Sequence, residues 1–248
     1  MSASDESLDF SERWLRDGLR ILNPPHSVVQ VTVDMTNALR RLEDYRRAGH
    51  HVSPTHLLVQ AAARALAGNR QLHQLVAGTR RHFPERVDIG LSITGETFVA
   101  PGLVIEGADH KTPPEIAAEI VRRVPEAQAA DQALRRALKQ WGWLVPFGFL
   151  RRAVLRLLFS SAEFRRRGAG TFQVSVVPAE WACTSTFSTA GVLMAGQVRS
   201  QVVAVDGQPA VRPMMTMTLS GDHGVWDGRA AVRFMATVKA DLESQPAG

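Results

Sequence analysis

The sequence predicts an α/β fold in which helices pack on a β-sheet, and two neighbouring patterns near the C-terminus carry that prediction. Residues 214–222 alternate strictly, with Met217 and Leu219 on the apolar face and threonine and serine on the other, which is the period of a half-buried strand. Beyond Gly228 the apolar residues recur at helical spacing, and Asp227 stands where a helix N-cap belongs. A strand, a tight turn and a helix therefore follow one another here.

The preceding chain predicts further helices and strands from apolar periodicity, caps and turn signals. Helices are expected over residues 8–22, 37–48, 56–67 and 112–124, the last resuming to about 139. Strands are expected over 28–34, 87–93, 98–105, 171–175, 191–204 and 211–222, with 69–77 a short irregular piece. Thr36 and Ser53 are the expected caps of the second and third helices. Thr94–Thr97 and Asp206-Gly207 predict hairpin turns, the second of type I′.

Composition limits the classes of protein that the chain can be. Its 248 residues suit one large domain or two small ones, and the single Cys183 allows no disulfide within the chain, which is typical of a reducing cytoplasm. The acidic, polar start predicts no signal peptide. The net charge of +5 comes from scattered arginines, and one tyrosine offers no stacking platform, so nucleic acid is not an expected partner. Such a charge also suits the phosphates of a small-molecule cofactor.

His223 continues the apolar face of the C-terminal strand, next to a glycine-rich turn. An imidazole there can be partly desolvated and titrates near neutrality, which suits a general base. The alternative is a core histidine whose ring is satisfied by a backbone carbonyl. The motif around His223 favours the first interpretation.

Residues 222–228 read Asp-His-Gly-Val-Trp-Asp-Gly. This stretch resembles the active-site motif Asp-His-Arg-Val-Ile-Asp-Gly in the catalytic domain of the dihydrolipoamide acyltransferases of 2-oxo-acid dehydrogenase complexes, a relative of chloramphenicol acetyltransferase. Gly224 and Trp226 replace the arginine and the small apolar residue, and Trp226 beside the base suggests a reshaped pocket.

Other landmarks resemble the same family in the same order. They are Asn69–Leu72, Asp88–Leu91, Phe98–Leu103, Lys111–Ile116 and Thr171–Ser175, so the resemblance covers roughly residues 8–245 without 134–168. It implies a two-layer α/β sandwich like that of chloramphenicol acetyltransferase, with a mixed sheet packed against helices. Residues 1–248 are then expected to form a single acyltransferase catalytic domain.

The resemblance also implies the residues of the active site. His223 matches the general base, which takes a proton from the attacking thiol or hydroxyl. Ser175, 48 residues earlier, matches the serine that stabilises the tetrahedral oxyanion, with residues 184–186 (Thr-Ser-Thr) as second choices. Alone, Ser175 would be an ordinary hydroxyl on a half-buried strand.

Asp227 stands four residues beyond His223 and is expected to cap the following helix and support the histidine loop rather than complete a triad. The matching aspartate of the family forms an ion pair with an arginine near the N-terminus, for which Arg13 is the match and Arg16 the alternative. Cys183 has no histidine nearby in sequence, so it is a poor candidate nucleophile.

Residues 134–168 depart from the family. They interleave aromatic and aliphatic residues with arginines and contain Pro146, which argues against a membrane-spanning helix. A helical flap over the sheet or a subunit boundary is the favoured interpretation. A basic amphipathic surface that meets a membrane through residues 140–165 is the alternative.

The predicted function is acyl transfer from coenzyme A to a small-molecule or carrier-bound thiol, hydroxyl or amine. The family's site lies between subunits, and the polar C-terminus predicts an isolated homotrimer. No lipoyl group of the chain's own, no glycine-rich phosphate loop and no metal are expected, because His50, His51 and His56 lie in a polar loop and helix start without supporting ligands. A catalytically lapsed trimeric scaffold and a membrane- or lipid-associated protein are the alternatives.

Overall fold

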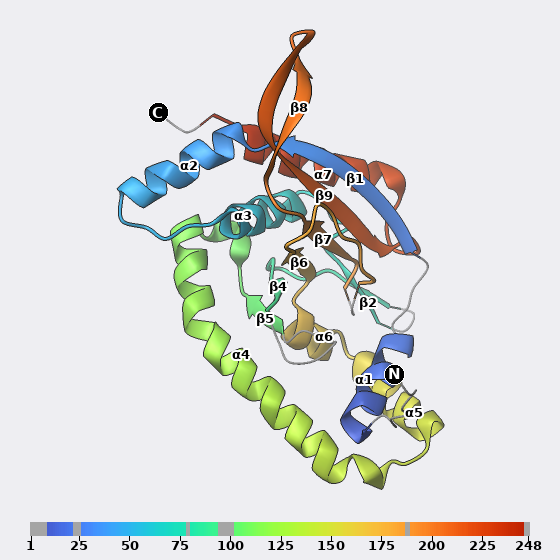
Figure 1. Ribbon diagram of the computed structural model, residues 1–248. Helices are drawn as coiled ribbons and strands as arrows, with labels where there is room; N and C mark the ends of the chain where they lie inside the picture. Colours follow the sequence, from blue (N-terminus) through green and yellow to red (C-terminus); the bar gives the residue numbers. More distant parts are fainter. Residues whose placement is uncertain (1–8, 22–25, 78–79, 94–101, 187–188, 246–248) are drawn as a thin grey trace, which may run out of the picture.

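The computed structural model describes residues 9–21, 26–77, 80–93, 102–186 and 189–245 (Figure 1). Its helices are α1 (Phe10–Ile21), α2 (Thr36–Arg47), α3 (Pro54–Ala67), α4 (Pro113–Trp141), α5 (Gly148–Phe159), α6 (Ala162–Ala169) and α7 (Gly228–Glu243), with short 3-10 turns η1 (Ala108–His110) and η2 (Gly142–Leu144). Its strands are β1 (His26–Asp34), β2 (Leu75–Ala77), β3 (Arg80–His82), β4 (Ile89–Ser92), β5 (Gly102–Ile105), β6 (Phe172–Val176), β7 (Gly191–Ala195), β8 (Arg199–Val205) and β9 (Gln208–Asp222).

The main sheet is mixed, as predicted. Its strands lie in the order β1-β9-β7-β6-β4-β5, and β8 pairs with β9 outside this path. The pairs β4–β6 and β6–β7 are parallel, and the other pairs are antiparallel. The expected antiparallel pairing of the two strands before residue 105 is therefore confirmed, while its turn lies outside the described residues. Together with helices packed on the sheet, this arrangement confirms the predicted two-layer α/β sandwich.

One face of the sheet forms the hydrophobic core with α3 and α7. Phe172 of β6 meets Phe234 of α7 with ring centroids 5.3 Å apart, and both side chains are almost fully buried. Leu219 of β9 and Leu57 of α3 are also fully buried. Burial of each such side chain stabilises the fold by roughly 1.5–3 kcal/mol relative to exposure.

The other face carries β6 residues Gln173 and Ser175, because side chains alternate along a strand and Phe172 and Val174 point into the core. Helix α6 packs closely on this face. A Cβ on Gly90 of β4 would lie 2.2 Å from the carbonyl oxygen of Ala169, so only glycine permits the approach.

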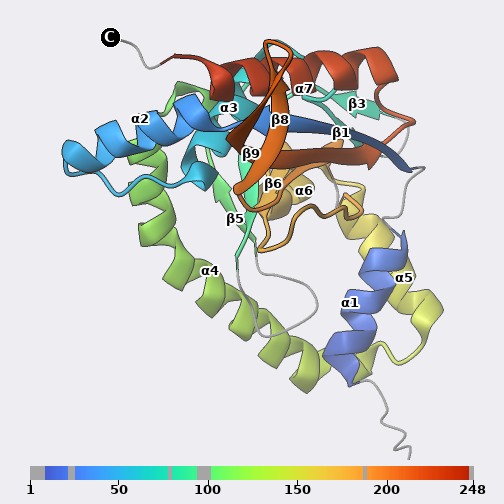
Figure 2. The same ribbon diagram turned by 45° about the horizontal axis from the view of Figure 1, so that its top comes forward.

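Helix α4 leaves the sheet and leads to α1 and α5, which lie side by side away from α2 and α7 (Figures 1 and 2). The carboxylate of Asp17 on α1 joins them. It accepts a hydrogen bond from Arg151 Nε at 2.9 Å and from Arg152 Nη1 at 3.1 Å, and the side chains of Asp17 and Arg151 are 6% and 8% exposed. None of the described helices has the length and apolar composition needed to cross a bilayer.

Two helix boundaries differ from the prediction. Helix α4 continues through Pro125, where the sequence predicted an interruption. The residues that follow are rich in alanine, the strongest helix former, which offsets the missing donor of proline. Thr36 is the first residue of α2 rather than its cap, because the carboxylate of Asp34 accepts from both Thr36 N and Thr36 Oγ1.

The β8–β9 hairpin extends beyond the rest of the sheet (Figure 1). Its two-residue turn places Asp206 at φ 51° and Gly207 at φ 77°, between the paired Val205 and Gln208. Positive φ at both central residues defines the type I′ turn that the sequence predicted.

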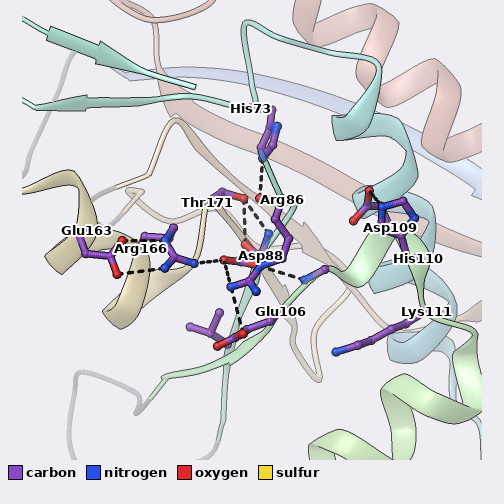
Figure 3. A network of polar contacts seen from close by, with 12 residues as sticks. His73, Arg86, Asp88, Glu106, Asp109, His110, Lys111, Glu163, Arg166 and Thr171 are labelled. Carbon is purple, nitrogen blue, oxygen red and sulfur yellow. Dashed lines mark hydrogen bonds and ion pairs between the residues drawn. The ribbon is translucent and has the colours of Figure 1, made fainter. Parts of the chain in front are cut away.

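The carboxylate of Asp88, directly before β4, is the charged centre of a buried network (Figure 3). It accepts hydrogen bonds from Arg86 Nε at 2.7 Å, Arg166 Nη1 at 2.6 Å and Gly107 N at 3.0 Å. Its backbone carbonyl accepts from Thr171 N at 2.6 Å. The network therefore fastens α6, the chain after β5 and the start of β6 to one point.

Burial alone would raise the pKa of the Asp88 carboxyl, but the hydrogen bonds from Arg86, Gly107 N and Arg166 outweigh it and lower this pKa. The carboxylate therefore stabilises the folded state above the unfolded pKa of about 3.9, and this contribution is lost as the pH falls through the lower folded pKa.

We expect Asp88→Asn to lower the free energy of unfolding by about 2 kcal/mol at pH 7, because two arginines lose a charged acceptor. Urea unfolding measures the change, and Glu106→Gln, which removes only an exposed carboxylate near Arg86, is the control. The difference between wild type and Asp88→Asn should shrink in the acid range below about pH 4. A difference that persists unchanged at low pH would contradict this account.

Candidate active site

His223 follows the last residue of β9 and begins the loop that leads to α7. Its Nδ1 lies 3.1 Å from the carbonyl oxygen of Trp226. A carbonyl only accepts, so Nδ1 carries the proton and donates it to this bond. The Nε2 atom then holds the lone pair, which is the state that a general base requires.

The loop after His223 is held by backbone bonds and by a buried indole. Trp226 is 2% exposed, and its Nε1 donates to the carbonyl oxygen of Ala190 at 2.9 Å. A Cβ on Gly221 would lie 2.4 Å from the same carbonyl oxygen of Ala190, so the glycine lets the backbone before β7 come close to β9. Trp226 is therefore a core residue behind the loop, with its ring centroid 6.0 Å from that of His223.

His223 is exposed in the single chain. The sequence predicted an imidazole pointing into the apolar layer and partly desolvated, and within one protomer this expectation is wrong. The strand ends at Asp222, so the alternation that placed His223 on the apolar face does not extend to it. Further desolvation of the ring would come from a neighbouring protomer.

Asp227 is the N-cap of α7, as predicted. Its carboxylate accepts from Ala230 N at 2.8 Å, and its own N–H donates to Gln71 Oε1 at 3.1 Å. The ion pair with Arg13 stays a prediction. The Arg13 guanidinium lies 5.2 Å from the ring centroid of Phe10, and the side chain of the alternative, Arg16, lies outside the described part of the structure.

Ser175 lies on β6, far from His223 of the same chain. It is in register with Met194 of β7, which is in register with Thr218 of β9. His223 is five residues beyond Thr218, so the two Cα atoms are separated by about 17 Å along the strands and about 10 Å across them, or about 19 Å in all. One protomer cannot bring both side chains to the same atom.

Two of the second choices for the oxyanion donor make contacts before β7. Thr186 Oγ1 donates to the carbonyl oxygen of Thr189 at 2.8 Å, and the backbone carbonyl of Thr184 accepts from Ser220 Oγ at 2.5 Å. The first contact lies within the segment before β7 and the second fastens that segment to β9, while residues 184–186 stay second choices for the donor.

Sequence reasoning missed a polar cluster formed by His26, Ser220 and Cys183. His26 Nε2 lies 2.6 Å from Ser220 Oγ, and Cys183 Sγ lies 3.6 Å from the same oxygen. Because Ser220 Oγ donates to the carbonyl oxygen of Thr184, it accepts from His26 Nε2–H, which fixes the orientation of this ring. No sequence signal links residues from three distant segments.

Neither His223 nor Ser175 lines any of the five principal cavities formed by the described residues. The most spacious, of about 890 Å³, lies beside the β2–β3 hairpin and α6, away from both side chains. The same part of the chain holds no group of three His, Cys, Asp or Glu side chains arranged for a metal. His56 instead serves as the partner of Ser53 in the capping box of α3.

The family model of the 2-oxoacid dehydrogenases acyltransferase (catalytic domain) matches residues 21–136 and 187–247. The lipoamide acyltransferase component of the branched-chain alpha-keto acid dehydrogenase complex of Bacillus subtilis is 26% identical over 233 residues, which is 89% of this chain and 47% of that protein. A succinyltransferase component of the 2-oxoglutarate dehydrogenase complex of Bartonella vinsonii is 45% identical over 53 residues, 21% of this chain and 13% of that protein. The chain thus spans about half the length, or less, of these relatives.

Solved structures share the fold. A truncated catalytic core of the 2-oxoacid dehydrogenase complex of Thermoplasma acidophilum gives a TM-score of 0.73 at 18% identity, covering 99% of this chain and 100% of that one. Chloramphenicol acetyltransferase gives 0.55 at 16% identity, covering 98% and 99%. A dihydrolipoamide acetyltransferase of Azotobacter vinelandii, studied for the catalytic roles of a serine, a histidine and an asparagine, gives 0.69 at 20% identity, covering 97% and 91%.

We expect Asp227→Ala to lower the midpoint of thermal unfolding by about 2–4 °C, because Ala230 N loses its acceptor. Asp227→Ser keeps a capping oxygen and should stay close to wild type. The hydrogen bond from Ala230 N lowers the pKa of the Asp227 carboxyl, so the difference between wild type and the alanine variant should vanish as the pH falls through that pKa. Equal loss in both variants would argue against the capping role.

Proposed function

Because the chain belongs to the family of 2-oxoacid dehydrogenase acyltransferase catalytic domains, we propose that it transfers an acyl group from a coenzyme A thioester to a thiol, hydroxyl or amine. The observation that carries this proposal is the hydrogen bond from His223 Nδ1 to the Trp226 carbonyl, which leaves Nε2 as the proton acceptor. The names of the relatives make a dihydrolipoyl thiol the first acceptor to test.

His223 acts as the general base in the proposed reaction. Its Nε2 takes the proton of the acceptor, whose sulfur, oxygen or nitrogen attacks the thioester carbon. The tetrahedral intermediate then collapses, the carbon–sulfur bond to coenzyme A breaks, and the leaving thiolate takes the proton from the imidazolium. Base catalysis of this kind contributes about 10²–10⁴-fold in rate.

Ser175 is proposed to donate its hydroxyl proton in a hydrogen bond to the oxyanion of the intermediate. Its half-buried position on a central strand holds the donor in one place, which is what transition-state stabilisation requires. Asp227 supports the base by fixing the start of α7, and the ion pair with Arg13 remains part of the proposal.

The separation of about 19 Å between His223 and Ser175 within one chain favours a site shared between two protomers. We propose a homotrimer in which His223 of each protomer meets Ser175 of the next, since a ring of three closes with identical interfaces. The exposure of His223 in the single chain supports this arrangement.

We expect His223→Ala to lower kcat for acyl transfer by about 10²–10⁴-fold, and Ser175→Ala by about 10²–10³-fold. The assay separates free coenzyme A from its thioester by chromatography, with dihydrolipoamide as acceptor, because the reaction consumes one thiol for each that it releases. Each variant should keep the thermal unfolding midpoint of wild type within a few degrees.

Coexpression of the two variants tests the shared site. A mixed trimer contains one interface with both native residues, so random mixing should restore about a quarter of the wild-type activity. The double variant, Ser175→Ala with His223→Ala, coexpressed with His223→Ala is the control and should restore none. Mixed trimers as inactive as the parent variants would overturn the shared site.

A lapsed scaffold is the first alternative, because Gly224 and Trp226 replace residues of the family's motif. The backbone carbonyl of Trp226 accepts the hydrogen bond that orients His223, whatever side chain this position carries. Gly224 N donates to the carboxylate of Asp222 at 2.8 Å. Both replacements therefore preserve the loop, which supports the active enzyme. A scaffold would show the same background rate with and without His223.

A membrane-associated surface is the second alternative, because η2 and α5 expose large apolar side chains. Trp143, Phe147, Phe149 and Leu157 are 55–74% exposed. The charges nearby are largely used inside the protomer, since Arg151 and Arg152 bind Asp17 and Arg166 binds Asp88. Fewer unpaired arginines are therefore available to bind an anionic lipid surface than the sequence predicted.

Flotation with anionic liposomes measures this alternative. Membrane contact through residues 140–165 predicts that wild type floats and that Phe147→Ser with Phe149→Ser, a stacked and exposed pair, does not. We expect both proteins to remain at the bottom of the gradient. Flotation that this double variant abolishes would favour the membrane function.

A further inference from the structure

A cavity of about 390 Å³ lies between the sheet and helices α1, α4, α5 and α6. Its volume falls in the range of small-molecule sites. Apolar side chains form most of its wall, among them Trp14, Leu134, Leu138, Leu158, Phe159 and Phe164. Several of them lie outside residues 21–136 and 187–247, which the family model matches, so this wall belongs largely to the departure from the family.

Glycines keep the cavity open. Gly18 of α1 and Gly168 of α6 line it, and a Cβ on either would meet no atom within 4 Å. On the sheet side, Gly90 and Gly102 add no side chain to fill the space. Gly18 and Gly168 could therefore have carried packing side chains and carry none, whereas Gly90 is glycine because α6 lies so close to it.

The charged groups of the wall are already paired. Arg165 donates from Nε to the carbonyl oxygen of Phe159 at 2.5 Å and from Nη1 to that of Val76 at 2.6 Å. Asp131 binds Arg135 at 2.7 Å. Because these contacts use the polar atoms within the protein, the remaining surface favours a hydrocarbon over a charged or strongly polar ligand.

The cavity reaches β6 next to the proposed oxyanion donor. Gln173 lines the cavity, and Ser175 follows two residues later on the same face of the strand, about 7 Å away. A carbonyl group held at Ser175 would therefore have the apolar space beside it. The chain attached to that carbonyl carbon is the part of the substrate that can enter.

We propose that this cavity binds the hydrocarbon tail of the transferred acyl group, so that the substrate is a coenzyme A thioester of an extended, unbranched acyl chain. The proposal rests on the acyltransferase function. An alkyl chain of the acceptor could also occupy the cavity. The acyl tail is favoured because its first carbon is bonded to the carbonyl that Ser175 would hold.

Binding without turnover tests the proposal. Alkyl-coenzyme A thioethers carry the tail but no transferable group, so calorimetric titration with the ethyl, hexyl and decyl compounds measures the tail alone. Wild type should bind about fourfold more tightly for each methylene that enters the cavity. Gly168→Leu and Gly18→Leu each add a side chain at a helix position that lines the cavity. Both variants should bind the ethyl compound as wild type does, while losing most of the gain in affinity with chain length.

Gly68→Leu is the matched control, because it adds the same side chain at a helix end with ordinary contacts and outside the cavity. It should keep the wild-type dependence on chain length. Thermal unfolding confirms that all three variants fold. The proposal is overturned if wild type shows no gain with chain length, or if both cavity variants keep the full gain.

The source of the tail and the underlying function are separable. If the binding of the thioethers does not depend on chain length, while primary alkanols become better acceptors as they lengthen, the cavity serves the acceptor and the acyl assignment is wrong. His223→Ala should bind the decyl thioether normally while losing transfer. If His223→Ala transfers the acyl group at the wild-type rate, the proposed role of His223 as general base is refuted, while the measured binding of the thioether still stands.

Discussion

Three segments converge on the carboxylate of Asp88, whose side chain is 1% exposed. A buried charge is tolerated only where donors surround it, since desolvation costs several kcal/mol. Arg86, Arg166 and Gly107 N meet that requirement and fix α6 against β4, while the backbone carbonyl of Asp88 accepts from Thr171 N and holds the start of β6. The apolar cavity lies beside α6 and Ser175 lies on β6, so the carboxylate of Asp88 supports the first and its backbone the second.

The register of the sheet determines what a single protomer can do. Parallel pairing of β6 with β7 and antiparallel pairing of β7 with β9 direct Ser175 and His223 to opposite ends of the sheet. Each protomer therefore carries two half-sites, one with a base whose proton position is set by Trp226 and one with a hydroxyl beside an apolar cavity. Association joins two halves that the fold itself keeps apart.

Local patterns in the sequence were sufficient for much of the fold. The strand before His223, the cap at Asp227 and the turn at Asp206-Gly207 follow from residues within a few positions of each other, where alternation and capping act directly. The sequence showed Asp88 only as part of a strand motif, because its partners lie up to 83 residues away. The His26–Ser220 contact spans 194 residues and leaves no periodic trace. The burial of Arg151 could not be predicted either, because an arginine in an apolar segment is expected at the surface. Its partner Asp17 is distant in the sequence.

The attachment of α1 to α5 differs in kind from the packing of the core. The sheet and α3 share many fully buried side chains, whereas the far end of the molecule is closed by the ion pairs of Asp17 with Arg151 and Arg152 and by partly exposed apolar residues. Regions with fewer buried contacts open at a lower free energy than the whole molecule unfolds. Contacts between these two helices are therefore expected to break before the strands separate, which makes the wall that Trp14 and Leu158 give the cavity its least rigid side.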